Sequence, residues 1–324
     1  MKTPFKQWLI ALVGLMSVAT GAPGQDYPNK PVKLIVGYAP GGGPDVAARV
    51  LGQQLSKILG QAFVVETKLG AGGTLAAAQV ARSPADGYTL MVGETGQLSI
   101  APYLFKGLSY DTIKDFTPVA LVAAVPLVFV SNARTTRIKT IQDLVREAKA
   151  NPGKFHYGSS GIGTLHHLTM EVFKTDAGVD LTHVSYKGSG QSVPALLSGE
   201  VPVLVTALMV VWPHVRAGTV NLLAVTTAAR SADIPDVPSL SEVIKDYDYS
   251  AEVGVLAPAG LPPEALSRLS KAIRAALDAP DVQHKFKEVG LTPAWATPEG
   301  YADNLRRNLK KYERAVRVAN VQPN

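Results

Sequence analysis

The sequence has no cysteine among its 324 residues. This absence excludes a disulfide framework and a thiol nucleophile, so the fold must be held together by packing. After the N-terminal region, no stretch approaches the roughly 18 consecutive apolar residues that a membrane-spanning helix needs, and we expect a soluble mature chain. The sequence also lacks H-E-x-x-H, C-x-x-C and any cluster of carboxylates, so we expect no metal site and no cofactor.

The first 22 residues read as a secretory signal peptide. Lys2 and Lys6 form a short basic region, and the apolar segment 8–18 that follows is too short to span a bilayer. Thr20 and Ala22 are small residues placed as a cleavage site requires. Because no cysteine follows, a lipid anchor is excluded, and we predict export to the periplasm.

The chain is modestly basic, with 32 lysines and arginines against 26 aspartates and glutamates. The basic residues concentrate only in the segment 306–317, where on a helix they would lie opposite an apolar face. No aromatic residues interleave with a basic stripe, so a solvated helix face explains the pattern and nucleic-acid binding is not predicted.

The segment from Val32 to Gly60 predicts a strand, a glycine-rich turn and a helix. The apolar run 32–36 is typical of a strand buried on both faces. The Pro-Gly-Gly-Gly-Pro segment 40–44 can continue neither a strand nor the inside of a helix. From Asp45 onward, apolar residues recur on one helical face, and Gly60 suits the end of that helix. Such a turn exposes free backbone N–H groups that suit an anion, although many glycine turns serve geometry alone.

Strand and helix patterns alternate along the rest of the chain and predict an α/β fold. The β-α-β-α-β order up to residue 92 indicates a parallel sheet. The apolar run 119–130 is predicted to leave one lobe and enter another, and 252–256 is predicted to return. We therefore predict two lobes with two chain crossovers and a cleft between them. Residues 23–122 and 252–324 are assigned to lobe 1, and residues 123–251 to lobe 2. Predicted helices include 141–150, a segment closed by Gly178, 193–197 and roughly 298–318.

Glycine turns of the same kind recur at Gly70–Thr74 and Gly158–Thr164. In open α/β sheets ligands bind beyond the carboxyl ends of the strands, so turns from two lobes could face one cleft. Leu75 stands where a dinucleotide site needs its third glycine, and Gly158–Thr164 has neither a P-loop lysine nor a G-x-S-x-G elbow. His166 and His167 diverge by about 100° on a helix, which makes them a poor metal pair. The case for an enzyme is therefore thin.

Several segments together resemble a known family. They are the signal peptide, VGYAPGGGPDVAAR, LGAGGTLAAAQVARSPADGYTLMV, YDTIKDFTPVALV, YGSSGIGTLHHLTMEVF and HVSYKGSGQSVPALLSGEV. In order and spacing they resemble the substrate-binding proteins of tripartite tricarboxylate transporters, also called Bug-type receptors, over essentially the whole mature chain. The resemblance implies a type II-like, two-lobed periplasmic binding protein. Such a receptor is not an enzyme; it closes on a small organic carboxylate and delivers it to a membrane permease, and we expect a monomer.

The resemblance also implies ligand-binding residues. The family's first ligand loop matches Tyr38, Ala39, Pro40, Gly41, Gly42, Gly43, Pro44 and Asp45. Its amides are implied to hold one carboxylate, partly through ordered water, while Asp45 braces the loop or caps the helix. Tyr38 would stack on the ligand or pack nearby. The opposing loop matches Ser159, Ser160, Gly161, Gly163 and Thr164, with His166 beside it. Thr95 is a further candidate, and the Gly70–Gly73 motif is implied to be mostly structural.

The sequence departs from the family after Gly199-Glu200-Val201. Where the family often shows acidic and amide residues, roughly F-D-N, this chain has Val205, Thr206 and Ala207. Thr206 joins the candidate ligand-binding residues on a wall that is less polar than usual. This favours a carboxylate with an apolar body, such as an aromatic carboxylate, with a dicarboxylate also open. No acceptor for an amino acid's ammonium group is evident from the sequence.

Two other functions stay open on the sequence. An α/β hydrolase-like enzyme would use Ser159 or Ser160 as nucleophile, and it needs a histidine and a carboxylate within hydrogen-bond reach. A sensory receptor would close on its ligand in the same way and present it to a signalling partner. Sequence does not separate this receptor from a transport protein.

Overall fold

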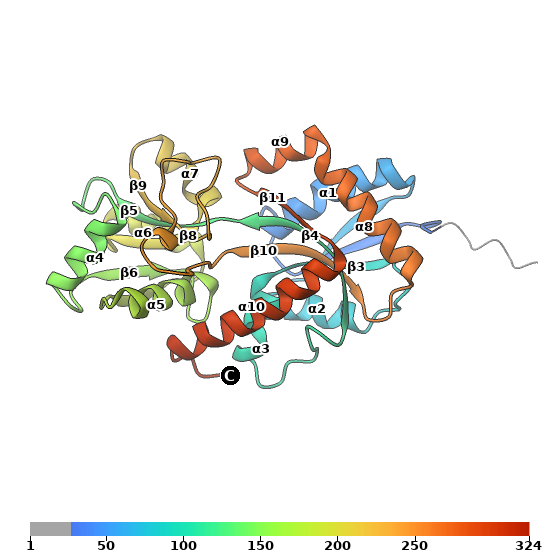
Figure 1. The fold of residues 1–324 in the computed structure, drawn as a ribbon, viewed down its shortest axis with the longest axis horizontal. Coiled ribbons are helices and arrows are strands. Elements are labelled where there is room, and N and C mark those ends of the chain that lie inside the picture. The colour runs from blue at the N-terminus through green and yellow to red at the C-terminus, as the bar shows by residue number, and fades with distance from the viewer. Residues whose placement is uncertain (1–26, 324) are drawn as a thin grey trace, which may run out of the picture.

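The computed structural model describes residues 27–323 and places two α/β lobes side by side (Figure 1). A six-stranded sheet forms the centre of lobe 1, and a five-stranded sheet forms the centre of lobe 2. The predicted two-lobed α/β fold is confirmed. The predicted signal peptide lies outside the described residues. Within 27–323, every helix is too short or too polar to cross a membrane.

The sheet of lobe 1 is mixed. Its strands are β1 (Val32–Val36), β2 (Phe63–Thr67), β3 (Thr89–Glu94), β4 (Phe116–Val125), β10 (Ala251–Pro258) and β11 (Thr292–Ala296), in the spatial order β11-β4-β10-β3-β1-β2. Strand β1 pairs in parallel with β2 and β3, as predicted, whereas β10 runs antiparallel between β3 and β4. The carboxyl ends of β1 and β3 therefore lie at the same edge of the sheet, and the turns after them begin there.

Helices cover both faces of this sheet. They are α1 (Gly43–Leu59), α2 (Thr74–Ala81), α3 (Ala101–Leu104), α8 (Pro263–Asp278), α9 (Pro280–Glu288) and α10 (Pro298–Val318), with short helical turns η1 (Ala71–Gly73) and η2 (Gly96–Ile100). Helix α1 buries Ala47, Leu51 and Leu55, whereas Ile58, which the sequence pattern placed on the apolar face, is 40% exposed. It ends at Gly60, whose left-handed φ of 70° suits a residue without a Cβ.

Lobe 2 repeats the alternation with a different strand order. Its strands are β5 (Leu127–Asn132), β6 (His156–Ser159), β7 (Thr182–Ser185), β8 (Val203–Ala207) and β9 (Val220–Val225), in the order β7-β6-β8-β5-β9. Its helices are α4 (Ile141–Ala150), α5 (Leu165–Ala177), α6 (Ser189–Ser198) and α7 (Leu208–Arg216), with a further helical turn η3 (Leu240–Glu242). Strand β6 pairs in parallel with both β7 and β8, so the turn after β6 lies at the carboxyl edge of this parallel part.

Two neighbouring strands carry the chain between the lobes. Strand β4 leads directly through Pro126 into β5, and β10 returns beside β4 with antiparallel pairing from Ala251 to Pro258. Figure 1 shows both strands running along the middle of the molecule from one lobe to the other. The break that the sequence indicated at Pro126 divides the run into two strands, because proline supplies no N–H to a sheet.

Helix α10 packs on both lobes. Tyr301 and Leu305, in its first half, lie in a hydrophobic cluster of lobe 1. Tyr312 and Val316, in its second half, lie in the main hydrophobic cluster of lobe 2. The long red helix crosses the lower part of Figure 1 accordingly. The lobe boundaries assigned from the sequence stay a prediction, and this helix is shared by the two cores.

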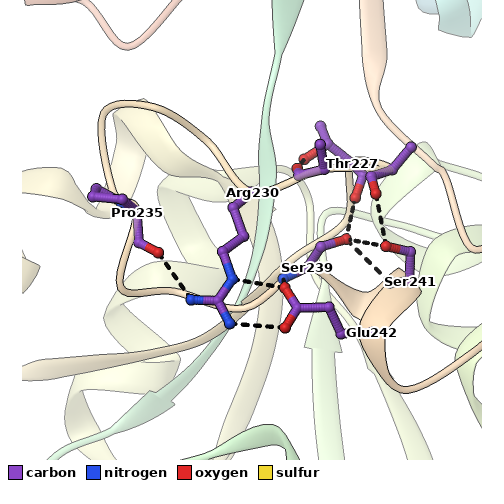
Figure 2. Close-up of polar contacts among 8 residues, drawn as sticks. Thr227, Arg230, Pro235, Ser239, Ser241 and Glu242 are labelled. Carbon is purple, nitrogen blue, oxygen red and sulfur yellow. Dashed lines mark hydrogen bonds and ion pairs between the residues drawn. The ribbon is translucent and has the colours of Figure 1, made fainter.

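A long segment without extended regular structure connects β9 to β10. Arg230 pairs with Glu242 through two contacts, at 2.7 Å from Nε and 2.8 Å from Nη2, and its third nitrogen donates to the carbonyl of Pro235 at 3.0 Å (Figure 2). The hydroxyl of Ser239 donates to the carbonyl of Thr227 at 2.5 Å. These bonds fix the path by which the chain returns to lobe 1.

Candidate functional site

Two backbone N–H groups of the first glycine turn donate hydrogen bonds to acceptors within the turn itself. The N–H of Gly41 donates to Oδ2 of Asp45 at 3.0 Å, and the N–H of Gly42 donates to the carbonyl of Ala39 at 3.1 Å. Gly41 has a φ of 85°, a conformation that favours glycine. Helix α1 begins at Gly43 without any side-chain cap. Within residues 27–323, no hydrogen bond uses the N–H groups of Gly43 and Asp45 in its first turn, so both can donate to an acceptor from outside.

Asp45 braces this turn. Its side chain is 2% exposed, and it accepts hydrogen bonds from the N–H of Gly41 and from Nε of Arg49. Burial raises the pKa of the Asp45 carboxyl, but the bonds from Arg49 and Gly41 outweigh burial and hold that pKa below its usual value. With both oxygens engaged, Asp45 shapes the turn rather than offering a free charge to a ligand.

The remaining residues of the turn differ in exposure. Ala39, Pro40 and Gly41 are exposed at its tip, and Pro44 is buried in the first turn of α1. A Cβ on Gly43 would lie 3.2 Å from Val125, at the end of the crossing strand β4. The start of α1 therefore lies at the boundary between the lobes.

Tyr38 and Glu94 form a polar pair beside this turn. The hydroxyl of Tyr38 lies close enough to the carboxyl group of Glu94 and to the backbone of Gln97 for both to shift its pKa. Burial raises the pKa of Glu94 to about 7, and the bond from Tyr38 only partly opposes this shift. We did not predict Glu94 from the sequence. The available signal was its place at the carboxyl end of a predicted strand, next to Thr95, which we did select.

Thr95 ties strand β3 to the crossing strand. It is 3% exposed, and its hydroxyl oxygen accepts a hydrogen bond from the N–H of Glu252 at 2.8 Å. The Gly70–Gly73 motif serves close packing, because a Cβ on Gly37 would come within 2.6 Å of Gly73. These contacts hold the two turns of lobe 1 against each other.

Most hydrogen-bonding groups of the second turn, in lobe 2, also have partners within the protein. The Oγ of Ser159 lies 2.7 Å from Nε2 of His183 and accepts from the N–H of Gly161 at 3.1 Å. The Oγ1 of Thr164 donates to the carbonyl of Gly161 at 2.7 Å and caps helix α5. The N–H of Gly163 donates to His167 at 3.3 Å. Ser159 is fully buried, so a ligand would have to replace one of its present partners.

Ser160 and His166 form the partly exposed polar pair of this turn. The Oγ of Ser160 lies 2.5 Å from Nδ1 of His166. Burial lowers the pKa of His166 to about 4, so its ring is neutral near pH 7 and can donate from one nitrogen while accepting at the other. These groups can donate hydrogen bonds to an oxygen anion without bringing a formal charge.

The structure fulfils only part of what the alternative enzyme hypothesis requires. Ser159 and Ser160 each contact a histidine, at His183 and His166 respectively. Within residues 27–323, however, the structure gives neither histidine a hydrogen bond to a carboxylate that would orient it, as a catalytic triad requires. Burial also lowers the pKa of both rings to about 4, which makes them weak bases. The described residues likewise contain no group of three metal-ligating side chains.

Thr206 is a further polar group at the lobe boundary. It lies near the end of β8, is fully buried, and its Oγ1 has no hydrogen-bond partner within the described part of the chain. Its neighbour Ala207 pairs with Leu127 and packs against the main hydrophobic clusters of both lobes. An unpartnered buried hydroxyl is costly, so this position favours an additional contact.

The helix that follows each glycine turn begins at the boundary between the lobes. Leu165, the first residue of α5, packs against the main clusters of both lobes, as Ala207 does. A Cβ on Gly163 would lie 2.9 Å from Leu104 of lobe 1. Both helix N-termini thus lie at the boundary between the lobes, one from each lobe; that they share one ligand site stays a prediction.

A cavity of about 560 Å³ lies at another part of this boundary. It is lined by Leu104 and Phe105 of lobe 1, Ile162, His167 and His183 of lobe 2, and the tail Ala319–Gln322 after α10. It borders the second turn through Ile162 but contains none of the predicted ligand residues. His183 faces this cavity and also holds Ser159 in place.

Comparison with known proteins identifies relatives over nearly the full length. The family model for the "Tripartite tricarboxylate transporter family receptor" matches residues 47–321. A solved structure of a periplasmic transporter is 35% identical, with a TM-score of 0.79, covering 91% of this chain and 99% of its own. Rpa4515 from R. palustris, solved with adipate, is 32% identical, with a TM-score of 0.80, covering 92% and 100%. MatC from Rhodopseudomonas palustris, solved with malate, is 30% identical, with a TM-score of 0.74, covering 90% and 100%.

Proposed function

This chain belongs to the tripartite tricarboxylate transporter receptor family, as its motifs predicted, and from that membership we propose that it captures a small organic carboxylate by closure of its two lobes. The bound anion is then delivered to the permease subunits of a tripartite tricarboxylate transporter. Solved relatives described as a periplasmic transporter and a periplasmic binding protein support the periplasm as the site of action, where the predicted signal peptide would send this chain.

The observation that carries the proposal is the uncapped start of α1 at the lobe boundary. Gly43 and Asp45 present two N–H groups that no group within the described residues uses. A helix N-terminus favours a negative charge through its dipole and its free donors. The opposite lobe adds Ser160, His166 and the unpartnered hydroxyl of Thr206. Relatives with adipate and with malate support a carboxylate as the anion.

We propose that the protein acts as a receptor and not as an enzyme. The Ser160–His166 pair is neutral, and within residues 27–323 the structure shows no carboxylate bonded to His166. Such a pair serves as a hydrogen-bonding wall for a ligand better than as a nucleophile and base. A ligand-presenting sensory receptor would use the same closure, and a pull-down with permease subunits would distinguish the two roles.

Ligand screening tests the proposal directly. Purified mature protein is titrated by calorimetry and thermal shift with acetate, benzoate, succinate, adipate, malate and aspartate. A ligand present at about 100 times its Kd raises the free energy of unfolding by about 2.7 kcal/mol. Ser160→Ala is expected to weaken binding about tenfold by removing one hydrogen bond to an anion. Ser198→Ala, in the last turn of α6, is the matched control and should bind like the wild type. Absence of binding across the panel would refute the proposal.

A further inference from the structure

The cavity that borders the second turn has the size and the walls of a small-molecule site. Its volume of about 560 Å³ is typical of such sites. Its apolar wall consists of Leu104, Phe105, Ile162 and Val321, and the side chain of Ile162 is 67% exposed. Because Leu104 and Phe105 belong to lobe 1 and Ile162 belongs to lobe 2, an occupant of this cavity would contact both lobes at once.

Two histidine rings form a polar wall of this cavity, and their orientation is fixed by their neighbours. The ring of His183 lies between those of Tyr157 and His167, with ring centroids 4.8 Å and 4.3 Å away. Nε2 of His183 lies 2.7 Å from the Oγ of Ser159. Nδ1 of His167 accepts a hydrogen bond from the N–H of Gly163 at 3.3 Å. Each ring therefore uses one of its two nitrogens within the protein.

The second nitrogen of each ring has no hydrogen-bond partner within residues 27–323. Because a backbone N–H can only donate, the bond from Gly163 makes Nδ1 of His167 an acceptor. Burial lowers the pKa of His167, so near pH 7 its ring is neutral and carries its proton on Nε2. His167 is only 6% exposed, and a buried N–H group needs an acceptor. Since both rings line the cavity, an occupant there can supply the missing partners.

Among the described residues, no charged side chain lines this cavity. The rest of its lining, Ala319, Asn320 and Gln322, is uncharged. Glu171 and Lys174, which influence the pKa values of both rings, pair with each other at 2.9 Å, and neither lines the cavity. An ion bound here would lose its water without gaining an opposite charge, which is costly. The lining therefore favours an uncharged occupant.

We propose that this cavity is a second binding site, which takes a small uncharged molecule with an apolar body and a hydroxyl group, such as a phenol. The apolar body lies against Leu104, Phe105 and Ile162, and the hydroxyl oxygen accepts from Nε2 of His167. A hydroxyl suits the two rings because it can accept from one nitrogen and donate to another. The inference does not depend on the proposed carboxylate site, since the lining contains none of the predicted ligand residues.

The test uses three single-ring probes that differ in polarity and charge: phenol, benzene and benzylammonium. Binding to the purified protein at pH 7.5 is measured by NMR titration that follows the imidazole nitrogen signals. We expect phenol to shift the signals of His167 and His183 and to bind at least about fivefold more tightly than benzene. Benzylammonium should bind at least about tenfold more weakly than phenol, because its charge finds no partner in the cavity.

Three variants locate the site. Ile162→Arg fills the cavity from an exposed position and should weaken phenol binding at least about tenfold. Ile113→Arg, at an exposed isoleucine outside the cavity, is the matched control and should bind phenol like the wild type. His167→Phe keeps a ring but removes the N–H donor, and should weaken phenol binding about fivefold while leaving benzene binding unchanged.

The outcomes bear on this cavity alone, because none of the probes carries a carboxylate. The inference is overturned if phenol does not bind the wild type, if benzene or benzylammonium binds as tightly as phenol, or if Ile162→Arg binds phenol like the wild type. Unchanged phenol binding in a folded His167→Phe overturns the hydrogen bond assigned to His167. Thermal unfolding shows whether each variant is folded, and the exposed Ile162→Arg keeps the site testable should His167→Phe unfold.

Discussion

Met209 of lobe 2 lies directly on Gly290 of lobe 1. A Cβ on Gly290 would come within 2.9 Å of the Cβ of Met209 and 3.1 Å of its Cα. Gly290 also has a φ of 71°, which other residues adopt with strain. Met209 packs against the main hydrophobic cluster of lobe 1 although it belongs to α7 of lobe 2. The lobes therefore touch through a close backbone contact beside the start of α1, since a Cβ on Gly43 would lie 3.6 Å from Leu291.

Met209→Ala is expected to weaken ligand binding without touching the ligand. Losing part of the partly buried methionine side chain removes about 1 kcal/mol from the arrangement in which the lobes are in contact. The affinity for the ligand should fall about fivefold, mainly through faster dissociation. Stopped-flow and calorimetric measurements check this. Val243→Ala, an exposed apolar residue of lobe 2, is the control. Unchanged affinity in Met209→Ala would mean that this contact does not contribute to closure.

Asp45→Ala is expected to destabilise the first turn. It removes the acceptor for the N–H of Gly41 and the partner of Arg49, both now 3.0 Å from Oδ2 of the buried carboxylate. We expect a loss of about 2 kcal/mol in the free energy of unfolding, measured with urea at pH 7. Asp303→Ala, which breaks an exposed pair with Arg306, should cost less than about 0.5 kcal/mol. Equal losses in the two variants would contradict the bracing role.

The sequence predicted the elements whose signals are local. Helix α10 spans Pro298–Val318, as expected, because its apolar residues recur at helical spacing and Thr297 caps its start. Helix α4 has its predicted bounds for the same reason, with a capping box at Thr140. We did not predict α7, α9 or β11. In α7, an apolar run with Pro213 inside gives no clear helical face, and tertiary contacts decide its structure.

The site was predicted only in part, because some of its contacts join residues that lie far apart along the chain. Local sequence indicated that Gly41 and Gly42 offer amides, but it could not show that Asp45 and Ala39 already accept from them. Glu94 was missed because its partner Tyr38 lies far away along the chain and meets it only through parallel pairing of β1 with β3. Sequence patterns locate the turns; the pairing of strands decides which side chains meet there.

Glu94→Gln is expected to change how stability depends on pH. The pKa of Glu94 is raised from 4.5 to about 7, so the folded state binds more protons than the unfolded state between these values. The wild type therefore loses stability as the pH rises from 4.5 to 7, by on the order of 2–3 kcal/mol at most. Glu94→Gln should lack this loss and be more stable than the wild type at pH 8. Urea unfolding without ligand, at pH 5 and pH 8, measures the difference. If the stability of the wild type and of Glu94→Gln changes equally between the two pH values, the raised pKa assigned to Glu94 is wrong.

His166→Asn is expected to change the pH dependence of stability in the opposite direction to Glu94→Gln. Burial lowers the pKa of His166 from 6.5 to about 4, so its contribution to stability is complete above pH 6.5 and is lost as the pH falls toward 4. His166→Asn removes the part of this acid sensitivity that comes from His166, while the part from His183 remains. The slopes from Glu94 and His166 oppose each other between pH 4.5 and 6.5, so the wild-type curve can be flat there although both groups titrate. The two variants separate these contributions: Glu94→Gln should steepen the acid side, and His166→Asn should make it shallower, while His183, whose pKa burial also lowers to about 4, keeps its own share of the acid sensitivity. If His166→Asn keeps the wild-type curve, its ring is not held neutral by burial.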